Sequence, residues 1–527
     1  MAQLWNDIIE SDSPYYIGSI VVIGAPSSAQ RDEVIDGQQR LTTISLMLIA
    51  LRNSLLNRKG LDDVNREVQW LLSEPVHGAP PILRLCFANE NSNDLYTSLV
   101  LQEAKLPKTK GQDTFINNLE FLIGEVKKFA LTSKPSDIRT LLNKIKDIQI
   151  VFIRCGDRSA AYKLFESINA RSVSLASTDL IKNRILYLAH QSSKETLKDS
   201  ESKWREMELT FNEDATRLKT FIRHHWISLG RYTSHAKLFK DFETYLNKKK
   251  GSAFKYLNEL ASAAKSYVAL RTAEIDGLDK LSKVRYEREE IRRGLEFLSF
   301  LGVDQVYSVL LYLYLKDPKN FRKDLNRLIA FQFIYKYVPG SPSEPEKKYF
   351  AALPAGSITK QKMFQGLASL VSGKKADFSA KIIESLKYRE GRSGDVQFAL
   401  EKYLYSRGGP KAFRQPTIEH IISQSFTAAD ANKIGISKTK MSELVHSLGN
   451  LTVLEKVENG GDFSNKPYEE KSVLYKKDLY KGNREITKYA FDTDPLAATD
   501  KRAKALAECI YDIFIYALEK GKWPELV

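Results

Sequence analysis

Two stretches near the C-terminal end decide the fold of that region, QPTIEHIISQSF (415–426) and HSLGNLTVLEKVENGGDFSNKPYEEKSVLYKKDLY (446–480). The first sets a carboxylate beside an imidazole, Glu419 and His420. This pairing suits a hydrolase in which one group binds a hard cation and the other activates water. Neighbouring residues of a regular strand point to opposite faces. A site that uses both therefore needs a distorted strand or a turn, with further ligands from a later helix.

The second stretch offers those ligands in three asparagines, Asn450, Asn459 and Asn465. Mg²⁺ takes a few oxygen ligands and keeps several waters, which one carboxylate and one Asn amide would satisfy. Two glycines after Asn459 would let the loop fold toward the ion. Asn465 precedes a Lys-Pro pair, a context typical of a helix cap, and it stays the alternative second ligand.

This order of Glu-His, Asn and Asn resembles the HNH, or ββα-metal, endonuclease fold, and EHIISQSF is similar to the DHIVPQSF type of motif in guide-RNA nucleases. By position, the resemblance implies that His420 is the general base and that Glu419 and Asn459 bind Mg²⁺ or Mn²⁺. It also implies that Asn450, grouped with the catalytic residues, braces the loop. The alternative for His420 is a purely structural role. Three other histidines without such a motif are interpreted as structural: His224, His225 and His446.

A second candidate site lies in VIDGQQRLTT (34–43), at the junction of a predicted strand and a predicted helix. Gly37 lets the backbone approach a ligand closely, and the N-terminus of a helix favours an anion. Arg40 can clamp a phosphate with two hydrogen bonds, while Asp36 could hold Mg²⁺ or position water. From these residues alone, a phosphate site and a capped helix with surface polar groups are equally good interpretations.

DGQQRLTT, together with FESINARSVSLASTDLIKN (165–183), resembles the N-terminal domain of GmrSD-type, modification-dependent (type IV) restriction enzymes. That domain has a ParB/sulfiredoxin-like core and hydrolyses nucleoside triphosphate through DGQQR, and the phosphorothioate-sensing Ssp nucleases share the architecture. The resemblance implies an NTP site, with GTP as the candidate nucleotide, bound with Mg²⁺ and turned over with Asp36 as a catalytic residue. The residues implied to bind the nucleotide are Asp36, Gly37, Gln38, Gln39, Arg40, Asn169, Arg171, Asp179 and Lys182.

Two departures from the family pattern bear on nucleotide turnover. The family usually has Arg-Gly where this chain has Arg171-Ser172, at a tight turn. Family members usually begin with an IPxYQRxYxW-like segment ahead of the part that corresponds to MAQLWNDII (1–9), where this sequence starts. That segment contributes to the nucleotide pocket in the family, so we expect NTP turnover to depend on it.

Hydrophobic periodicity outside these motifs predicts a predominantly helical α+β fold. The apolar runs at 15–35 read as two short strands around a turn, DIQIVFIRCGD (147–157) as a third strand, and residues 61–140 as helices with polar loops. The long middle of the chain carries helical patterns with aromatic and Leu stripes. We expect a ParB/sulfiredoxin-like nucleotide-binding and sensing domain at 1–190, a helical linker and DNA-contact region at 191–375, and an HNH endonuclease domain at 376–527.

The composition excludes several protein classes. Hydrophobic residues make up 43% and charged residues 28% of the 527 positions, values of a globular protein rather than a disordered or membrane-embedded one. A formal net charge of +15 favours a polyanion such as nucleic acid. Three scattered cysteines (Cys86, Cys155 and Cys509) provide no disulfide framework or zinc site, which fits a reducing cytoplasm. The sequence contains no Walker A motif and no signal peptide.

Together these features predict a cytoplasmic, NTP-regulated, metal-dependent DNA endonuclease that nicks or cleaves modified foreign DNA in phage defence. The expected partners are double-stranded, modified phage DNA and a nucleoside triphosphate, with no membrane, and a homo-oligomer is compatible with this architecture. The alternative is a non-catalytic DNA- or NTP-binding regulator with a degenerate NTPase domain.

Overall fold

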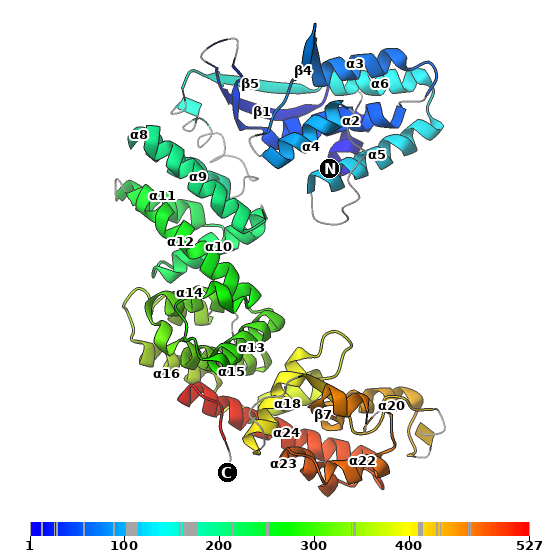
Figure 1. The fold of residues 1–527 in the computed structure, drawn as a ribbon, viewed down its shortest axis with the longest axis vertical. Helices are drawn as coiled ribbons and strands as arrows, with labels where there is room; N and C mark the ends of the chain where they lie inside the picture. Colours follow the sequence, from blue (N-terminus) through cyan, green and yellow to red (C-terminus); the bar gives the residue numbers. More distant parts are fainter. Residues whose placement is uncertain are drawn as a thin grey trace. The chain divides into compact units, whose positions relative to one another are not determined.

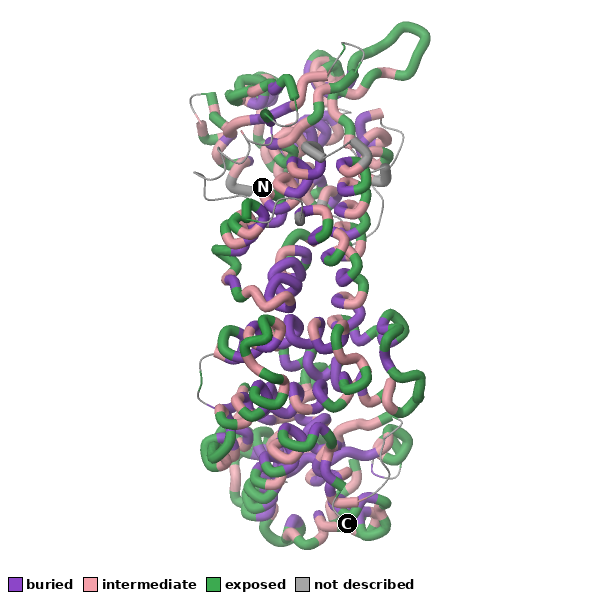
Figure 2. The backbone as a smooth tube through the Cα atoms, turned by 90° about the vertical axis from the view of Figure 1, so that its left-hand side faces the viewer, coloured by how far each residue is buried: buried purple, intermediate pink, exposed green. Residues whose placement is uncertain are grey.

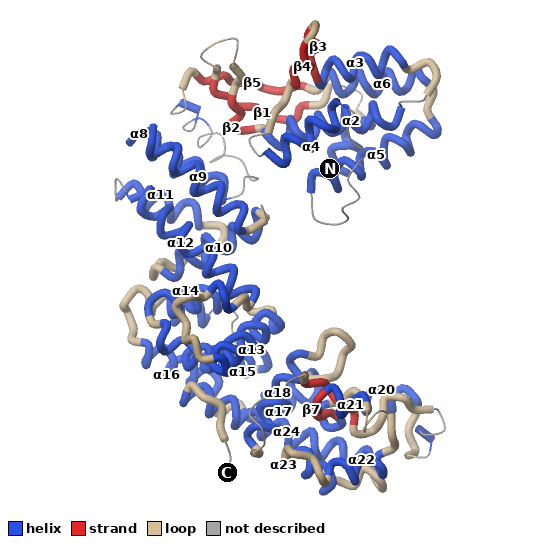
Figure 3. The backbone as a smooth tube through the Cα atoms, in the orientation of Figure 1, coloured by secondary structure: helices blue, strands red, loops and turns tan. Residues whose placement is uncertain are grey.

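The computed structural model groups the described residues into two compact units, Met1–Leu175 and Ala176–Val527. Figure 1 shows helices in both units and few strands, and Figure 3 separates the two classes by colour. The predicted class, α+β and predominantly helical, is confirmed. The structure describes residues 2–11, 14–25, 27, 30–55, 58–87, 90–101, 114–157, 160–161, 164, 177–192, 194–212, 214–248, 252–338, 340, 344–408, 415–427, 431–432, 434–461, 463 and 465–525.

The first unit holds a three-stranded sheet of β1 (Tyr16–Ile23), β2 (Glu33–Asp36) and β5 (Gln149–Cys155), in the order β2-β1-β5. Strand β1 runs antiparallel to β2 and parallel to β5. β-Branched side chains suit a pleated, half-buried strand, and Ile20 and Val22 of β1 are buried. The three strands predicted from the sequence here are confirmed.

Helices supply most of the core of the first unit. Helix α2 follows β2 after Gly37, whose φ of 95° is a conformation that glycine adopts without strain. The apolar stripe of α2 is buried at Leu48 and Leu51. The helix bounds are α1 Ala2–Glu10, α2 Gln38–Leu55, α3 Asp62–Leu72, α4 Glu90–Leu101, α5 Thr114–Thr132 and α6 Pro135–Lys146.

A short hairpin of β3 (Ser73–Val76) and β4 (Ala79–Leu83) lies in the segment 61–140, for which the sequence predicts only helices and loops. The prediction is wrong there. The hairpin sequence SEPVHGAPPIL contains three prolines, lacks apolar–polar alternation and is mostly exposed. Gly78, at φ 73°, lies in the turn, so turn chemistry rather than periodicity specifies this hairpin.

The second unit begins with a long series of helices, and the prediction that 191–375 is helical is confirmed. Figure 2 shows buried residues where these helices face one another. Helix α13 ends where Gly302 adopts φ 67°. The bounds are α8 Ser177–Ser192, α9 Lys194–Thr210, α10 Ala215–Ser228, α11 Leu238–Lys248, α12 Ser252–Thr272, α13 Arg285–Leu301, α14 Val306–Lys316, α15 Phe321–Tyr337, α16 Lys360–Val371, α17 Lys375–Ser385 and α18 Gly394–Ser406.

The C-terminal part of this unit is built on an antiparallel hairpin of β6 (Pro416–His420) and β7 (Leu451–Glu455). Glu419 lies opposite Thr452 in the register of the two strands. Short helices follow the hairpin, and one long helix closes the chain. Their bounds are α20 Lys438–Val445 between the strands, then α21 Lys456–Gly460, α22 Tyr468–Tyr475, α23 Lys481–Arg484 and α24 Pro495–Lys520.

Helix α24 supports the turn that leads into β7. Arg502 Nη1 donates to the carbonyl oxygens of Gly449 and Leu451, at 2.8 Å each. A Cβ on Gly449 would lie 2.0 Å from the carbonyl oxygen of Thr499, so the close approach of α24 requires glycine at this position. The helix therefore fixes the backbone just ahead of β7.

The regions 191–375 and 376–527 lie in the same compact unit, because α15 and α17 pack against α24. The boundary between the two units falls at Leu175, ahead of α8. Among the residues that the structure describes, no helix combines the length and the apolar character needed to span a bilayer.

Candidate functional site

Glu419 and His420 are the last two residues of β6, and each is only 5% exposed. The register of β6 on β7 runs unbroken through both residues, so no bulge brings their side chains to one face. Their surroundings differ accordingly. Glu419 contacts helix α22, whereas His420 contacts Tyr388 and His446.

Glu419 is held in a buried ion pair. Lys471 Nζ, from α22, lies 2.6 Å from Glu419 Oε1 and also donates to the carbonyl oxygen of His420 at 2.7 Å. The Tyr475 hydroxyl donates to the same carboxylate oxygen at 3.5 Å. Burial raises the pKa of Glu419, and the Lys471 ammonium opposes that shift. These contacts fasten α22 to the end of β6.

His420 lies against a second histidine. His446 Nδ1 is 3.3 Å from His420 Nε2, and the two rings meet at 81°. Burial, assisted by the positive charges that His446 and Lys471 can carry, lowers the pKa of His420 to about 4. Burial also lowers the pKa of His446. Both imidazoles are therefore neutral at pH 7.

A polar cavity of about 390 Å³ is lined in part by His446, the neighbour of His420. The segment that carries Tyr388 is hydrogen-bonded to the loop that carries His446, since Tyr388 N donates to the His446 carbonyl oxygen at 2.9 Å. A guanidinium and a side-chain amide in one cavity suit the oxygens of a phosphate backbone. The lining residues are Tyr388, Arg389, Glu390, Gln424 and His446.

Asn450 clamps the loop that follows His420. Its side chain is fully buried, and its amide nitrogen donates to the carbonyl oxygens of Ile422 at 3.0 Å and Val445 at 2.8 Å. Its amide oxygen accepts from Ile422 N at 2.8 Å. This amide group is used within the protein, in line with the bracing role expected for it and without contact to the cavity.

Asn459 and Asn465 take different positions around the hairpin. Asn459 Nδ2 donates to Thr417 Oγ1 at 3.0 Å and to the Ile418 carbonyl oxygen at 2.9 Å. The prediction that Asn465 caps the closing helix is wrong, because Pro467 is the N-cap of α22. Asn465 adopts φ 49°, and its amide oxygen instead accepts from the serine hydroxyls of the loop after His420.

The predicted metal ligands, Glu419 and Asn459, do not form a preformed metal site. The Glu419 carboxylate shares its charge with the Lys471 ammonium. The hydrogen bonds of Asn459 to β6 use its amide nitrogen and not the amide oxygen, which is the atom that would bind a cation. Within the described part of the chain, no group of three or more His, Cys, Asp or Glu side chains could hold a metal ion. A hard cation needs an anionic oxygen not already engaged by an ammonium. The Glu419 carboxylate, paired with the Lys471 ammonium, does not offer such an oxygen in this arrangement, and the assignments of Glu419 and Asn459 stay predictions.

The N-terminal candidate site brings three of its predicted residues together. Asp36 is buried at the end of β2, and its Oδ1 accepts from Gly37 N at 2.8 Å. Arg40 Nη1 lies 3.5 Å from Asp36 Oδ2 and donates to the carbonyl oxygen of Ser19 in β1. The guanidinium is thus anchored to the sheet beside the carboxylate, and it is about one-third exposed.

Four other predicted nucleotide-binding residues lie in described helices, Gln38 and Gln39 in α2 and Asp179 and Lys182 in α8. Gln38 and Gln39 are exposed at the start of α2, and Gln38 Nε2 donates to the Val34 carbonyl oxygen at 2.8 Å. Lys182 and Asp179 belong to α8 in the second unit, where Lys182 Nζ pairs with Glu208 at 2.9 Å. Two predicted positions lie outside the described residues: Asn169 and Arg171.

Sequence reasoning missed three residues of the His420 site. His446 has no motif around it, and its only signal is a position four residues ahead of Asn450, which fixes the same loop. Lys471 and Tyr388 reach the site through tertiary packing, from α22 and from the segment before α18. Nothing in local sequence spacing indicates either contact.

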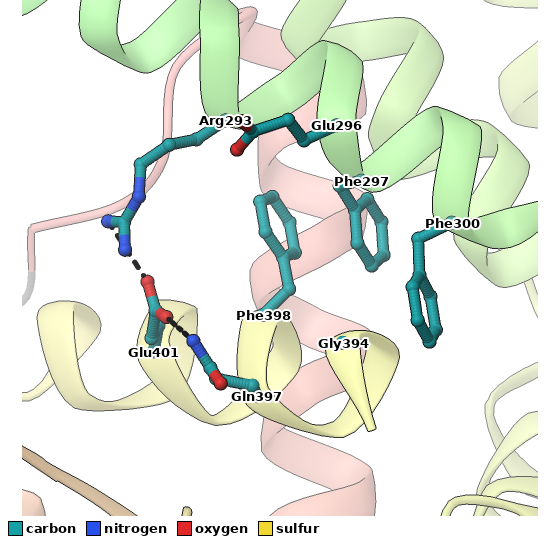
Figure 4. Close-up of a pocket in the computed structure, with 8 residues that line it drawn as sticks. All are labelled: Arg293, Glu296, Phe297, Phe300, Gly394, Gln397, Phe398 and Glu401. Carbon is teal, nitrogen blue, oxygen red and sulfur yellow. Dashed lines mark hydrogen bonds and ion pairs between the residues drawn. The ribbon is translucent and has the colours of Figure 1, made fainter. Parts of the chain in front are cut away.

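A second hollow, of about 180 Å³, lies between α13 and α18 (Figure 4). Arg293 Nη1 pairs with Glu401 at 3.1 Å, and Gln397 Nε2 donates to Glu401 at 3.0 Å. Figure 4 shows this polar group apart from the rings of Phe297 and Phe398, which stack with centroids 3.9 Å apart. Both oxygens of Glu401 have partners, so this hollow is a packed junction of two helices.

Two family models match the chain. Residues 1–186 match the N-terminal domain of the GmrSD restriction endonucleases, and residues 374–509 match their C-terminal domain. The Asp36–Arg40 segment lies inside the first match and the His420 site inside the second. A search of curated proteins finds no match. The predicted resemblance to GmrSD-type restriction enzymes is confirmed.

Proposed function

We propose that this chain, which belongs to the GmrSD restriction endonuclease family, hydrolyses DNA phosphodiester bonds with His420 as the general base. Its two family domains make it a DNA endonuclease of phage defence. The observation that carries the role of His420 is its setting: burial keeps the imidazole neutral at the end of β6, against His446, which lines a polar cavity together with Arg389.

A neutral imidazole can accept a proton from water as the resulting hydroxide attacks phosphorus. The cavity offers Arg389 and Gln424 as donors for the non-bridging oxygens of the phosphate. Lys471 holds the carbonyl of His420 and so limits movement of the residue that must meet the water. The surplus of +15 charges attracts the DNA backbone as a whole.

Assignment of the C-terminal domain to the HNH type rests on the motif order and on the hairpin of β6 and β7 followed by α22. Dependence on Mg²⁺ or Mn²⁺ rests on the same likeness. NTP hydrolysis, and control of cutting by it, are proposed for the Asp36–Arg40 segment, where a carboxylate and a guanidinium meet beside a helix N-terminus. Modified phage DNA is the proposed substrate.

Incubation of the full chain with modified and unmodified phage DNA tests this function. The arms contain Mg²⁺, Mn²⁺ or EDTA, each with and without GTP, and the products are separated on native and denaturing gels. We expect nicks or breaks that need a divalent ion and that increase on modified DNA with GTP.

Cleavage that persists in EDTA would show that the reaction needs no divalent ion. Equal cutting of both DNAs would show that the enzyme has no preference for modified DNA. Tight DNA or GTP binding without cleavage in any arm would favour the alternative, a non-catalytic regulator. Each arm therefore tests one part of the proposal.

A further inference from the structure

His446 is held rigidly beside His420 by two kinds of contact. Its backbone carbonyl accepts from Tyr388 N at 2.9 Å, next to a bridge between Lys387 and Ser447. The Tyr388 ring stacks on the His446 ring at 22° with 5.5 Å between centroids, and it meets the His420 ring edge to face at 4.7 Å. The His446 ring is thus fixed in place independently of its bond to His420.

We propose that His446 is a positioning residue for the nuclease reaction, which selects the tautomer of His420. With His446 Nδ1 as acceptor, the proton of neutral His420 resides on Nε2, 3.3 Å away. The lone pair of His420 is then on Nδ1, the nitrogen that His446 does not contact. His446 keeps its own proton on Nε2, so both rings are neutral and the contact has one donor and one acceptor.

This arrangement also helps the proton-transfer step, and it rests on the proposed function. Water loses a proton to His420 Nδ1 as its oxygen bonds to phosphorus, the P–O bond to the leaving oxygen breaks, and solvent water protonates that oxygen. His420 becomes an imidazolium, and its Nε2–H bond to neutral His446 becomes charge-assisted and stronger. An acidic partner plays this part in other hydrolases; in this chain the partner is a neutral ring.

Two substitutions separate this role from simple packing. His446→Phe keeps a flat ring against Tyr388 and removes the acceptor, whereas His446→Asn places an amide oxygen near the position of Nδ1 and removes the ring. If His446 acts through its acceptor, single-turnover cleavage should fall about 10–100-fold in His446→Phe, a loss of the size seen when the hydrogen-bond partner of a metal-ligating histidine is removed. His446→Asn should stay within about threefold of the parent chain.

Two results would contradict the acceptor role of His446. If His446→Phe cleaves as fast as the parent chain, or if His446→Asn loses as much as His446→Phe, the acceptor role is refuted. His420→Ala is measured in parallel: if it still cleaves, the proposed function itself fails, whereas its loss together with an active His446→Phe defeats only the present inference.

A direct readout covers the case in which a variant does not fold. ¹⁵N NMR of the full chain labelled at histidine reports which ring nitrogen carries the proton at pH 7. We expect His420 protonated on Nε2 and His446 protonated on Nε2. A His420 ring protonated on Nδ1 would overturn the assignment.

Discussion

Replacing Lys471 by methionine tests how the buried pair with Glu419 holds the site together. Lys471 Nζ is 2.6 Å from Glu419 Oε1, and the two side chains are only 2% and 6% exposed. Methionine keeps an unbranched apolar stem and removes the ammonium. Removing one partner of a buried pair costs about 3–5 kcal/mol, because the other charge stays buried.

Protonation of Glu419 sets the size of the loss in Lys471→Met. Left alone, the Glu419 carboxylate takes up a proton, and its ordinary pKa is 4.5. Keeping Glu419 protonated in the folded protein costs about 3.4 kcal/mol at pH 7 and about 0.7 kcal/mol at pH 5, from 1.36 kcal/mol per pKa unit. The lost bond to the His420 carbonyl adds about 1 kcal/mol. Because the pKa of Glu419 is raised in the folded variant, the free energy of unfolding of Lys471→Met falls as the pH rises. Relative to the parent chain, we expect a loss of about 4 kcal/mol at pH 7 and about 2 kcal/mol at pH 5.

The assay is urea unfolding of the full chain at both pH values, with hydrogen exchange of peptides that cover α22 as the local readout. Lys476→Met is the matched control, because Lys476 is exposed at the end of the same helix. Adding Glu419→Gln to Lys471→Met should recover much of the loss. A loss that does not depend on pH, or one equally large in Lys476→Met, would contradict the stabilising role of the pair between Lys471 and Glu419.

Cleavage should keep its rate down to about pH 5, because the pKa of His420 is lowered to about 4 and the ring gains its proton only as the pH falls toward that value; a pH–rate profile that drops with an apparent pKa near 6.5 contradicts this. Asn450→Leu should lower the free energy of unfolding by about 3 kcal/mol in urea titration, because three hydrogen bonds of a buried side chain are lost. An unchanged free energy of unfolding would show that Asn450 does not stabilise this loop. Arg40→Ala should weaken GTP binding measured by calorimetry, since its guanidinium lies beside Asp36. Equal affinity would show that the nucleotide does not bind at the Asp36–Arg40 segment.

Local patterns predicted the elements whose residues interact with near neighbours. The strands at 16–23, 33–36 and 149–155 have β-branched runs between turn residues, and the DGQQR segment does lie between a strand and a helix. The hairpin at 73–83 was missed because its turn and prolines leave no periodic pattern.

The pairing inside the His420 site could not be predicted in the same way. The motif located His420, but its neighbours come from three other segments: Tyr388 ahead of α18, His446 in the loop before β7, and Lys471 in α22. Asn465 was expected to cap a helix from its local context, and a long-range contact with the loop after His420 decides its position instead. Sequence spacing carries no information on such contacts.

Single-turnover cleavage of DNA by His420→Ala tests most directly whether His420 is the general base. His77→Ala is the matched control, since His77 is exposed in the turn between β3 and β4. We expect His420→Ala to lose at least about 10²-fold in rate while it keeps its fold and its DNA affinity, and His77→Ala to cleave like the parent chain. Cleavage by His420→Ala at more than about a tenth of the parent rate would contradict the role of His420 as the general base.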